Sequence, residues 1–251
     1  MIPEMVRISV LGGTLSADKN AGWSLMLSQP IVGACLAGAL LNPGPDWELW
    51  ALRVPIGVGV LLQLLLTDAS LPAAQRQHDT ATAGVVGTAV ALFGMVRLHG
   101  ILPTALGGAL WVVVGVTAGL LAAIAGGWAM RFHRTRSRED LVRADRLAAA
   151  GDASGFELLY WGSVLRAFLV GGFWTWGGTL VGLMIAILVL PHLSGYLSGR
   201  RVGFLLAALI GSGLGTAYHA HVRGRRQAIR WVVLGAAAAL TLSVVLRPRM
   251  V

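Results

Sequence analysis

The stretch SQPIVGACLAGALLNP, from Ser28 to Pro43, holds twelve residues between its two prolines, and only one of them is polar. A membrane-spanning helix needs about 20 apolar residues, whereas runs of about 10–14 are typical of core or re-entrant segments. Because proline interrupts a helix, Pro30 and Pro43 fix the two ends of this run. The sequence therefore predicts a short helical element that does not cross a bilayer, in which Gly33 and Gly38 let neighbouring backbone approach closely.

The composition of the whole chain indicates lipid as its solvent. The 251 residues are 56% hydrophobic and 12% charged, and the mean hydropathy is +0.72. Soluble domains are closer to about 45–50% apolar and about 25% charged. The run 101–130 carries no charge at all, which is enough for a tilted spanning helix. We expect residues 1–251 to form a single all-α, polytopic integral membrane domain.

The uncharged runs differ widely in length. Only 101–130 and 167–190 are comfortable spanning helices, and the shorter runs carry Gly or Pro, as the broken helices of transporters do. Irregular backbone at membrane depth survives only when it is buried in protein or lines a cavity. The first half is therefore expected to surround a cavity. The candidate segments are 5–17, 30–42, 54–67, 81–96, 101–130, 167–190, 202–218 and 231–246.

The positive charge is concentrated in two short segments. The formal net charge is +9, and many of the arginines lie in RFHRTRSREDLVRADR at 131–146 and HVRGRRQAIR at 221–230, directly beside apolar runs. This is the positive-inside pattern of a membrane protein rather than the footprint of a nucleic-acid-binding one. It predicts that 131–156 and 222–230 are cytoplasmic.

Within 131–156 the sequence predicts a basic loop that contains a surface helix. Ser137, with Asp140 three residues later, is a variant of the N-terminal capping box, and Glu139 lies four residues before Arg143. Gly151 fits a C-terminal stop. The segment is either a solvated connector or a docking site for a partner.

Four polar residues of the first half are candidates for substrate binding: Asp18, Gln63, His78 and Asp79. A polar or ionisable side chain at membrane depth is costly and marks a functional candidate. Gln63 stands among apolar neighbours in GVGVLLQLLL, where an amide can hydrogen-bond a hydroxylated ligand or join two helices. Both interpretations stay open.

No motif predicts catalysis, metal binding or a cofactor. Ser212 and His219 are two helical turns apart, about 10 Å, which is too far for a nucleophile and its base. His219 and His221 would point to different faces of a helix and make a poor metal pair. The chain also has no GxxxxGK[ST] motif for a nucleotide phosphate.

Two ordered blocks carry a further signal: LGGTLSADKNAGWSLMLSQPIVGACLAGALL, with Asp18, Ser28 and Pro30, and a later block that contains Gln63 and Asp79. These blocks resemble the enzyme IIC component of the mannose/fructose/sorbose family of the sugar phosphotransferase system. Asp18 matches the family's leucine-aspartate element, and Ser28 with Pro30 matches its SRPIV element. GVGVLLQLLLTDASLPAAQRQHDTATAGVVGTA resembles the family's LE…PPD…GTA block. Gln63 and Asp79 are sixteen residues apart, the spacing of the family's glutamate and last aspartate.

The resemblance continues through 133–170 and fades after 190. It implies that the run 31–42 is a re-entrant or half-spanning element facing a sugar cavity. It also implies a subunit of the bacterial inner membrane that binds and passes a hexose-type sugar without carrying the phosphoryl group. Its implied partners are a IID membrane subunit and the phosphorylated cytoplasmic IIB protein with IIA, and a higher oligomer of IIC–IID pairs is left open. We expect IIB to dock on Arg134, Arg136 and Arg138, because of their charge and predicted side of the membrane.

The chain departs from the family pattern at three places. Asn42-Pro43 replaces Gly-Asp, Gln63 replaces Glu, and Gln77-His78-Asp79 replaces Pro-Pro-Asp. These losses of charge or rigidity favour an alternative, a degenerate IIC-like protein with a regulatory or scaffold role and no transport. A transporter unrelated to phosphotransfer is the third class that the sequence leaves open.

Overall fold

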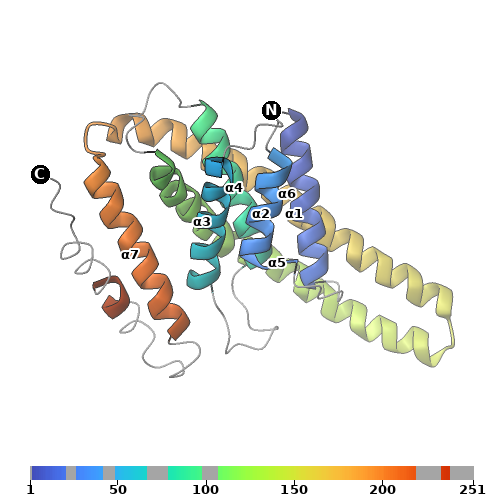
Figure 1. The fold of residues 1–251 in the computed structure, drawn as a ribbon. Coiled ribbons are helices and arrows are strands. Elements are labelled where there is room, and N and C mark those ends of the chain that lie inside the picture. Colours follow the sequence, from blue (N-terminus) through green and yellow to red (C-terminus); the bar gives the residue numbers. More distant parts are fainter. Residues whose placement is uncertain are drawn as a thin grey trace, which may run out of the picture.

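A computed structural model describes residues 2–20, 27–41, 49–66, 79–97, 107–218 and 233–237, and within these ranges every regular element is a helix. Successive helices run in alternating directions, and the distal halves of α5 and α6 project beyond the others as a hairpin (Figure 1). The all-α fold class is therefore confirmed for the described chain. The helices are α1 (Ile2–Asn20), α2 (Pro30–Leu41), α3 (Leu49–Leu65), α4 (Thr80–Arg97), α5 (Gly107–Ala149), α6 (Ala153–Leu193) and α7 (Gly199–Tyr218).

Three of the described helices, α5, α6 and α7, are long and apolar enough to cross a membrane. The first two were expected as comfortable spans, whereas α7 was expected only as one of the shorter segments. The predicted short element is confirmed as α2, whose 12 residues extend about 18 Å. This is less than the roughly 30 Å of a bilayer's hydrocarbon core.

Helix α2 begins where its sequence predicts. Pro30 is its first residue, a position where the missing N–H of proline costs nothing, and the Gly33 N–H already donates to the Gln29 carbonyl at 3.0 Å. Gly33 and Gly38 are both buried. A Cβ on Gly38 would lie 2.5 Å from Cγ of Pro55 in α3, so this glycine is needed for close helix packing. Pro43 lies outside the described residues.

The core lies between α3, α4 and α5. Val58, Val86, Val90 and Val116 are fully buried there, within a larger apolar cluster. Glycines bring the backbones together: a Cβ on Gly87 would lie 2.5 Å from the Gly115 carbonyl oxygen. Small residues at helix interfaces are the usual means of packing apolar helices in lipid.

The segment 131–156 differs from the predicted loop. Helix α5 runs without interruption from Gly107 to Ala149, and the Ser137 hydroxyl donates to the His133 carbonyl at 3.0 Å instead of capping a new helix. The predicted helix start at Ser137 is wrong because no Gly or Pro interrupts the chain between Trp128 and Ala150. A helix already in progress therefore continues.

The predicted end of this helix is correct. Gly151 has a positive φ of 69°, the left-handed conformation that ends a helix. Asp152 then caps α6, since its carboxylate accepts from the Gly155 N–H at 2.9 Å and from the Ser154 hydroxyl. These two hydrogen bonds lower the pKa of Asp152. The charged part of α5 and the start of α6 thus form a helical hairpin, which we call the distal hairpin (residues 131–166).

Two ion pairs of different burial occur in the distal hairpin. Arg166 of α6 and Asp140 of α5 are 2.8 Å apart and partly buried, so this pair joins the two helices. Arg136 and Glu139, 3.4 Å apart, are both exposed. Exposed pairs contribute about 0–1 kcal/mol at most, so the joining contact is Asp140–Arg166.

We predict that Gly84→Ala destabilises the bundle while Gly177→Ala does not. A Cβ on Gly84 would clash with the backbone carbonyl of Pro30, and a backbone atom cannot move aside as a flexible side chain can. Overpacking of this kind costs about 1–3 kcal/mol. A Cβ on Gly177, also in a helix, would meet no atom within 4 Å. Thermal unfolding of the purified variants in one detergent tests this, and equal midpoints would contradict the close α2–α4 contact.

Candidate functional site: a buried polar network

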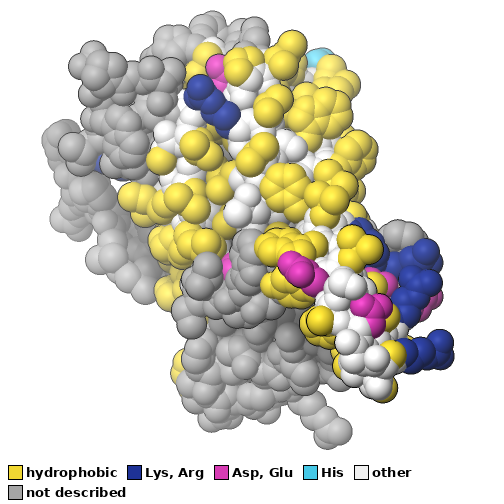
Figure 2. Space-filling view, turned by 90° about the vertical axis from the view of Figure 1, so that its right-hand side faces the viewer, with side chains coloured by type: hydrophobic (Ala, Val, Ile, Leu, Met, Phe, Trp, Pro, Cys, Tyr) yellow, Lys and Arg dark blue, Asp and Glu magenta, His cyan; other side chains and the backbone are white. Residues whose placement is uncertain are grey.

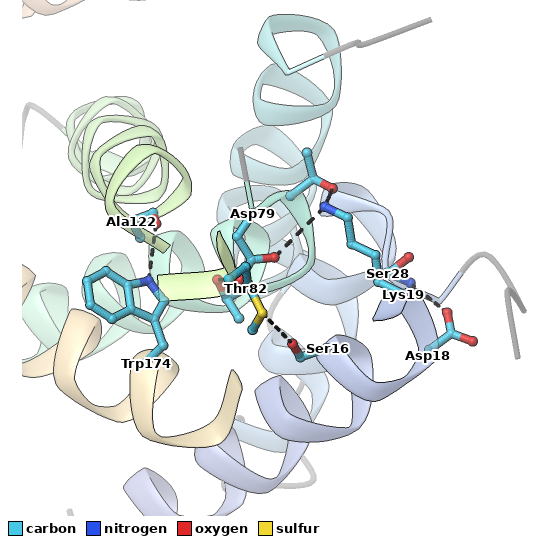
Figure 3. A network of polar contacts seen from close by, with 10 residues as sticks. Ser16, Asp18, Lys19, Ser28, Asp79, Thr82, Ala122 and Trp174 are labelled. Carbon is cyan, nitrogen blue, oxygen red and sulfur yellow. Dashed lines mark hydrogen bonds and ion pairs between the residues drawn. The ribbon is translucent and has the colours of Figure 1, made fainter. Parts of the chain in front are cut away.

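Side chains at or near the ends of α1 and α4 and along α5 and α6 meet the backbone of Ser28, just before α2, at one end of the bundle. Figure 3 shows them where α1 ends, where α2 and α4 begin, and where α5 and α6 pass alongside. We call this set the polar network: Ser16, Asp18, Lys19, Ser28, Asp79, Thr80, Thr82, Met130 and Trp174, with the carbonyl groups of Ala122 and Ala123.

The carboxylate of Asp18 joins α1 to the segment that leads into α2. Asp18 is buried, with 1% of its surface exposed, and its Oδ2 accepts from the Ser28 backbone N–H at 3.3 Å. A negative charge close to a helix N-terminus is favourable because the unpaired N–H groups there carry partial positive charge. Asp18 thus helps fix the position at which α2 starts.

Asp79 stands directly before α4 and is equally buried, at 1% exposed. Its Oδ2 accepts from the Thr82 hydroxyl at 2.9 Å, and its backbone N–H donates to the Ala123 carbonyl of α5 at 2.9 Å. Lys19 Nζ lies 3.9 Å from its Oδ1. A buried carboxylate is stable only when paired or hydrogen-bonded, and Asp79 has both kinds of support.

Lys19 connects α1 to the start of α4. Besides its contact with Asp79, its ammonium group donates to the Thr80 hydroxyl at 2.8 Å. Its side chain is only 9% exposed. Lys19 and Asp79 therefore form a pair of opposite charges that is almost completely removed from solvent.

Helix α5 supplies two successive carbonyl groups to the network. Trp174 Nε1 donates to the Ala122 carbonyl at 3.1 Å, next to the Ala123 carbonyl that accepts from Asp79. A Cβ on Gly126, one turn further along α5, would lie 2.5 Å from Trp174 Nε1 and 3.1 Å from Cβ of Asp79. Glycine at 126 is therefore what allows both side chains to lie against α5.

The network offers chemistry for a hydroxylated ligand. Carboxylate oxygens accept from hydroxyl groups, an ammonium group donates to them, and threonine hydroxyls do both. The indole of Trp174 adds an apolar face, while its single donor is already bonded to the Ala122 carbonyl. Among the described residues, no group of three or more His, Cys, Asp or Glu could hold a metal ion.

The structure brings together two of the four predicted binding residues. Asp18 and Asp79 both belong to the polar network, on opposite sides of Lys19 in sequence and space. Gln63 lies half-buried near the end of α3 and makes none of the contacts drawn in Figure 3. His78 lies outside the described residues.

Seven members of the network were missed as site residues: Ser16, Lys19, Ser28, Thr80, Thr82, Met130 and Trp174. Lys19 is the only lysine of the chain and follows a candidate aspartate, which is the one signal that could have selected it. Thr82 lies three residues after Asp79, the spacing of a helix-start contact. Trp174 stands in GGFWTWGG with no distinguishing sequence feature, and only the packing of α5 against α6 selects it.

The predicted docking arginines lie on α5 in the distal hairpin. The side chains of Arg136 and Arg138 are exposed, as a docking role requires. Arg134 lies on the same helix, and its side chain is outside the described part.

Comparison with known proteins identifies no relative: no family model matches the chain, and no curated protein matches it. Over its described residues the chain is all-α. It has three helices long and apolar enough to cross a membrane, and a buried polar network at one end of the bundle.

We predict that Lys19→Met and Asp79→Asn each destabilise the protein, and that the double variant recovers part of the loss. Removing one member of a buried pair leaves the other charge uncompensated, which costs about 3–5 kcal/mol, whereas replacing both is often close to neutral. Thermal unfolding of the four proteins measures the coupling. Strictly additive losses would show that the two groups do not interact.

Proposed function

We propose that this chain is a multi-pass protein of the bacterial inner membrane. We further propose that it is the IIC translocation subunit of a phosphoenolpyruvate-dependent sugar phosphotransferase system of the mannose/fructose/sorbose type. Its membrane location is supported by the three long apolar helices and by the many apolar side chains on the surface of α6.

One observation carries the proposal. Asp18 and Ser28 come from the first block of the resemblance and Asp79 from the second, and the fold brings all three into one buried polar network. Sixty-one residues separate Lys19 from Thr80 in sequence, yet the two side chains share a hydrogen bond. Buried polar groups in an apolar bundle are costly, and in transporters they mark the substrate path.

In this proposal the network binds a sugar through its hydroxyl groups. Asp18 and Asp79 accept hydrogen bonds, Lys19 donates them, Trp174 offers the apolar face of its indole, and Gln63 contributes from the end of α3. No cofactor takes part, and this chain performs no covalent step. The phosphoryl group reaches the sugar from phosphorylated IIB, and a IID subunit completes the path.

A second candidate is a IIC-like protein with a regulatory or scaffold role. The observation that favours it is the internal pairing of the network: Lys19 faces Asp79, Thr82 donates to the same carboxylate, and Asp18 accepts from the chain itself. When the polar groups of a site already bond one another, a ligand gains less binding free energy from them. The two candidates differ in whether sugar passes at all.

The test is uptake of labelled hexoses by cells that express this chain with its candidate IID and IIB partners. We expect phosphorylated sugar to accumulate with the wild type and to fall by about tenfold or more with Asp79→Ala or Gln63→Ala, since each removes a ligand contact of about 1.5 kcal/mol or more. Asp145→Asn is the control, because Asp145 is an exposed carboxylate on the distal hairpin. No uptake with any sugar, despite stable insertion and partner association, would reject transport in favour of the scaffold role.

We also predict that IIB docks on the distal hairpin. Replacing Arg134, Arg136 and Arg138 together by alanine should reduce co-purification of phosphorylated IIB, most strongly at low salt, because exposed charges are screened as ionic strength rises. Arg200→Ala, at the exposed start of α7, is the matched control. Undiminished co-purification with the triple variant would reject this docking site.

A further inference from the structure

A groove runs between the two helices of the distal hairpin, separate from the polar network. Its volume is about 460 Å³, enough for part of an elongated molecule. The residues lining it come from α5 and α6 and divide into charged and apolar sets: Asp140, Arg143, Arg146 and Arg166, and Leu147, Gly155, Leu158, Leu159 and Gly162.

The charged part of the groove has an excess of positive charge. Arg166 pairs with Asp140 at 2.8 Å, which leaves Arg143 and Arg146 on the same wall. Both arginine side chains are exposed, and neither forms an ion pair with another residue of the described chain. Two guanidinium groups one helical turn apart present donors suited to a phosphate group.

The remaining wall is apolar and open. Leu158 is 77% exposed although it lines the groove, and Leu147 and Leu159 lie beside it. A Cβ on Gly162 would meet no atom within 4 Å, so the groove is unfilled at this point. A ligand that fits must therefore combine an anionic group with an apolar portion.

The hairpin as a whole has one polar and one apolar helix. The exposed residues of α5 here are mostly charged, including Arg138, Arg143 and Asp145. Helix α6 instead exposes large apolar side chains all the way from the hairpin into its spanning part; they are Phe156, Leu158, Tyr160, Trp161, Leu165 and Leu169. Figure 2 shows Lys and Arg side chains gathered at one edge of the projecting end, below a broad apolar surface.

The separation of charged residues on α5 from apolar residues on α6 is typical of a helical element that lies at a membrane–water interface. Amphipathic helices place their apolar face in the acyl boundary and their basic face near anionic headgroups. Tyr and Trp are enriched at this level, and Tyr160 and Trp161 stand together with ring centroids 5.4 Å apart. The apolar wall of the groove is thus continuous with the surface of α6 that we place in lipid.

We propose that this groove binds an anionic phospholipid from the membrane surface. The headgroup phosphate lies between Arg143 and Arg146, and an acyl chain follows Leu158 and Leu159 over Gly162. The proposal rests on the proposed membrane location but not on sugar transport. An acidic peptide fits the charge of the groove, but it would leave the apolar wall and its continuation along α6 uncovered.

The experiment is native mass spectrometry of the full-length purified chain, with phosphatidylglycerol as the probe and phosphatidylcholine as the neutral comparison. We expect the double variant Arg143→Ala/Arg146→Ala to retain phosphatidylglycerol about 30-fold more weakly, as the attraction of two arginines to an anionic surface implies. Gly162→Leu should weaken retention by filling the groove without changing its charge. Arg131→Ala, at an exposed arginine of the same helix outside the groove lining, should bind as the wild type does.

Further measurements separate the sources of the anion. Leu158→Ser should weaken phosphatidylglycerol binding and leave binding of inorganic phosphate unchanged. If inorganic phosphate displaces the lipid at equal concentration, or if a polyglutamate peptide binds more tightly than the lipid, the proposal is overturned. Equal lipid retention by wild type and both groove variants also overturns it.

A separate experiment tests the proposed membrane location. Fractionation of cells that express the chain shows whether it is in the membrane, whatever the lipid result. A chain found in the membrane fraction that retains phosphatidylglycerol and phosphatidylcholine equally would reject the lipid site alone.

Discussion

The position of Asp79 is the constraint on which one end of the bundle depends. Its carboxylate is almost fully buried, so it must be compensated from within the protein. The compensation comes from Lys19 at the end of α1 and Thr82 in the first turn of α4, while its backbone N–H reaches the Ala123 carbonyl on α5. Each of these contacts fixes a different helix, so α1, α4 and α5 can meet in only one arrangement. The beginning of α2 is then set through Asp18 and Ser28 of the same network.

This arrangement is possible only because glycines bring the helices close enough together. Gly126 makes room for Asp79 and Trp174 against α5, and Gly84 lets α4 lie against the first turn of α2. Glycine inside a helix usually costs about 0.5–1 kcal/mol relative to alanine. Here that cost is offset by close backbone packing, which also shortens the distance that polar side chains must span to reach one another. The glycines at these contacts and the buried polar groups therefore depend on one another.

The features that could be predicted from sequence are those decided locally. The short α2 follows from two prolines around an apolar run, and its start at Pro30 and the stop at Gly151 follow from the conformations these residues favour. The continuity of α5 could not be obtained in this way, because Ser137 and Asp140 carry a helix-start pattern whether or not a helix already precedes them. Asp140 instead pairs with Arg166, a partner twenty-six residues away that only the return of α6 provides. The same holds for the candidate site. Two of its carboxylates could be predicted from sequence, because a charged side chain at membrane depth is costly in free energy. Trp174 could not, because only the packing of α5 against α6 brings it to the site.

The short length of α2 is related to the position of the polar network. A helix of about 18 Å is too short to cross the hydrocarbon region of a bilayer. Its N-terminal end is the one beside Asp18, where the partial positive charge of its unpaired N–H groups faces a carboxylate. Gly38 against Pro55 and Gly84 against Pro30 hold α2 between α3 and α4, so its position is set by packing on both sides. A longer helix ending at the same place would carry its first turn past the network. Pro30, at which α2 begins, therefore also helps to keep the polar end of the bundle assembled.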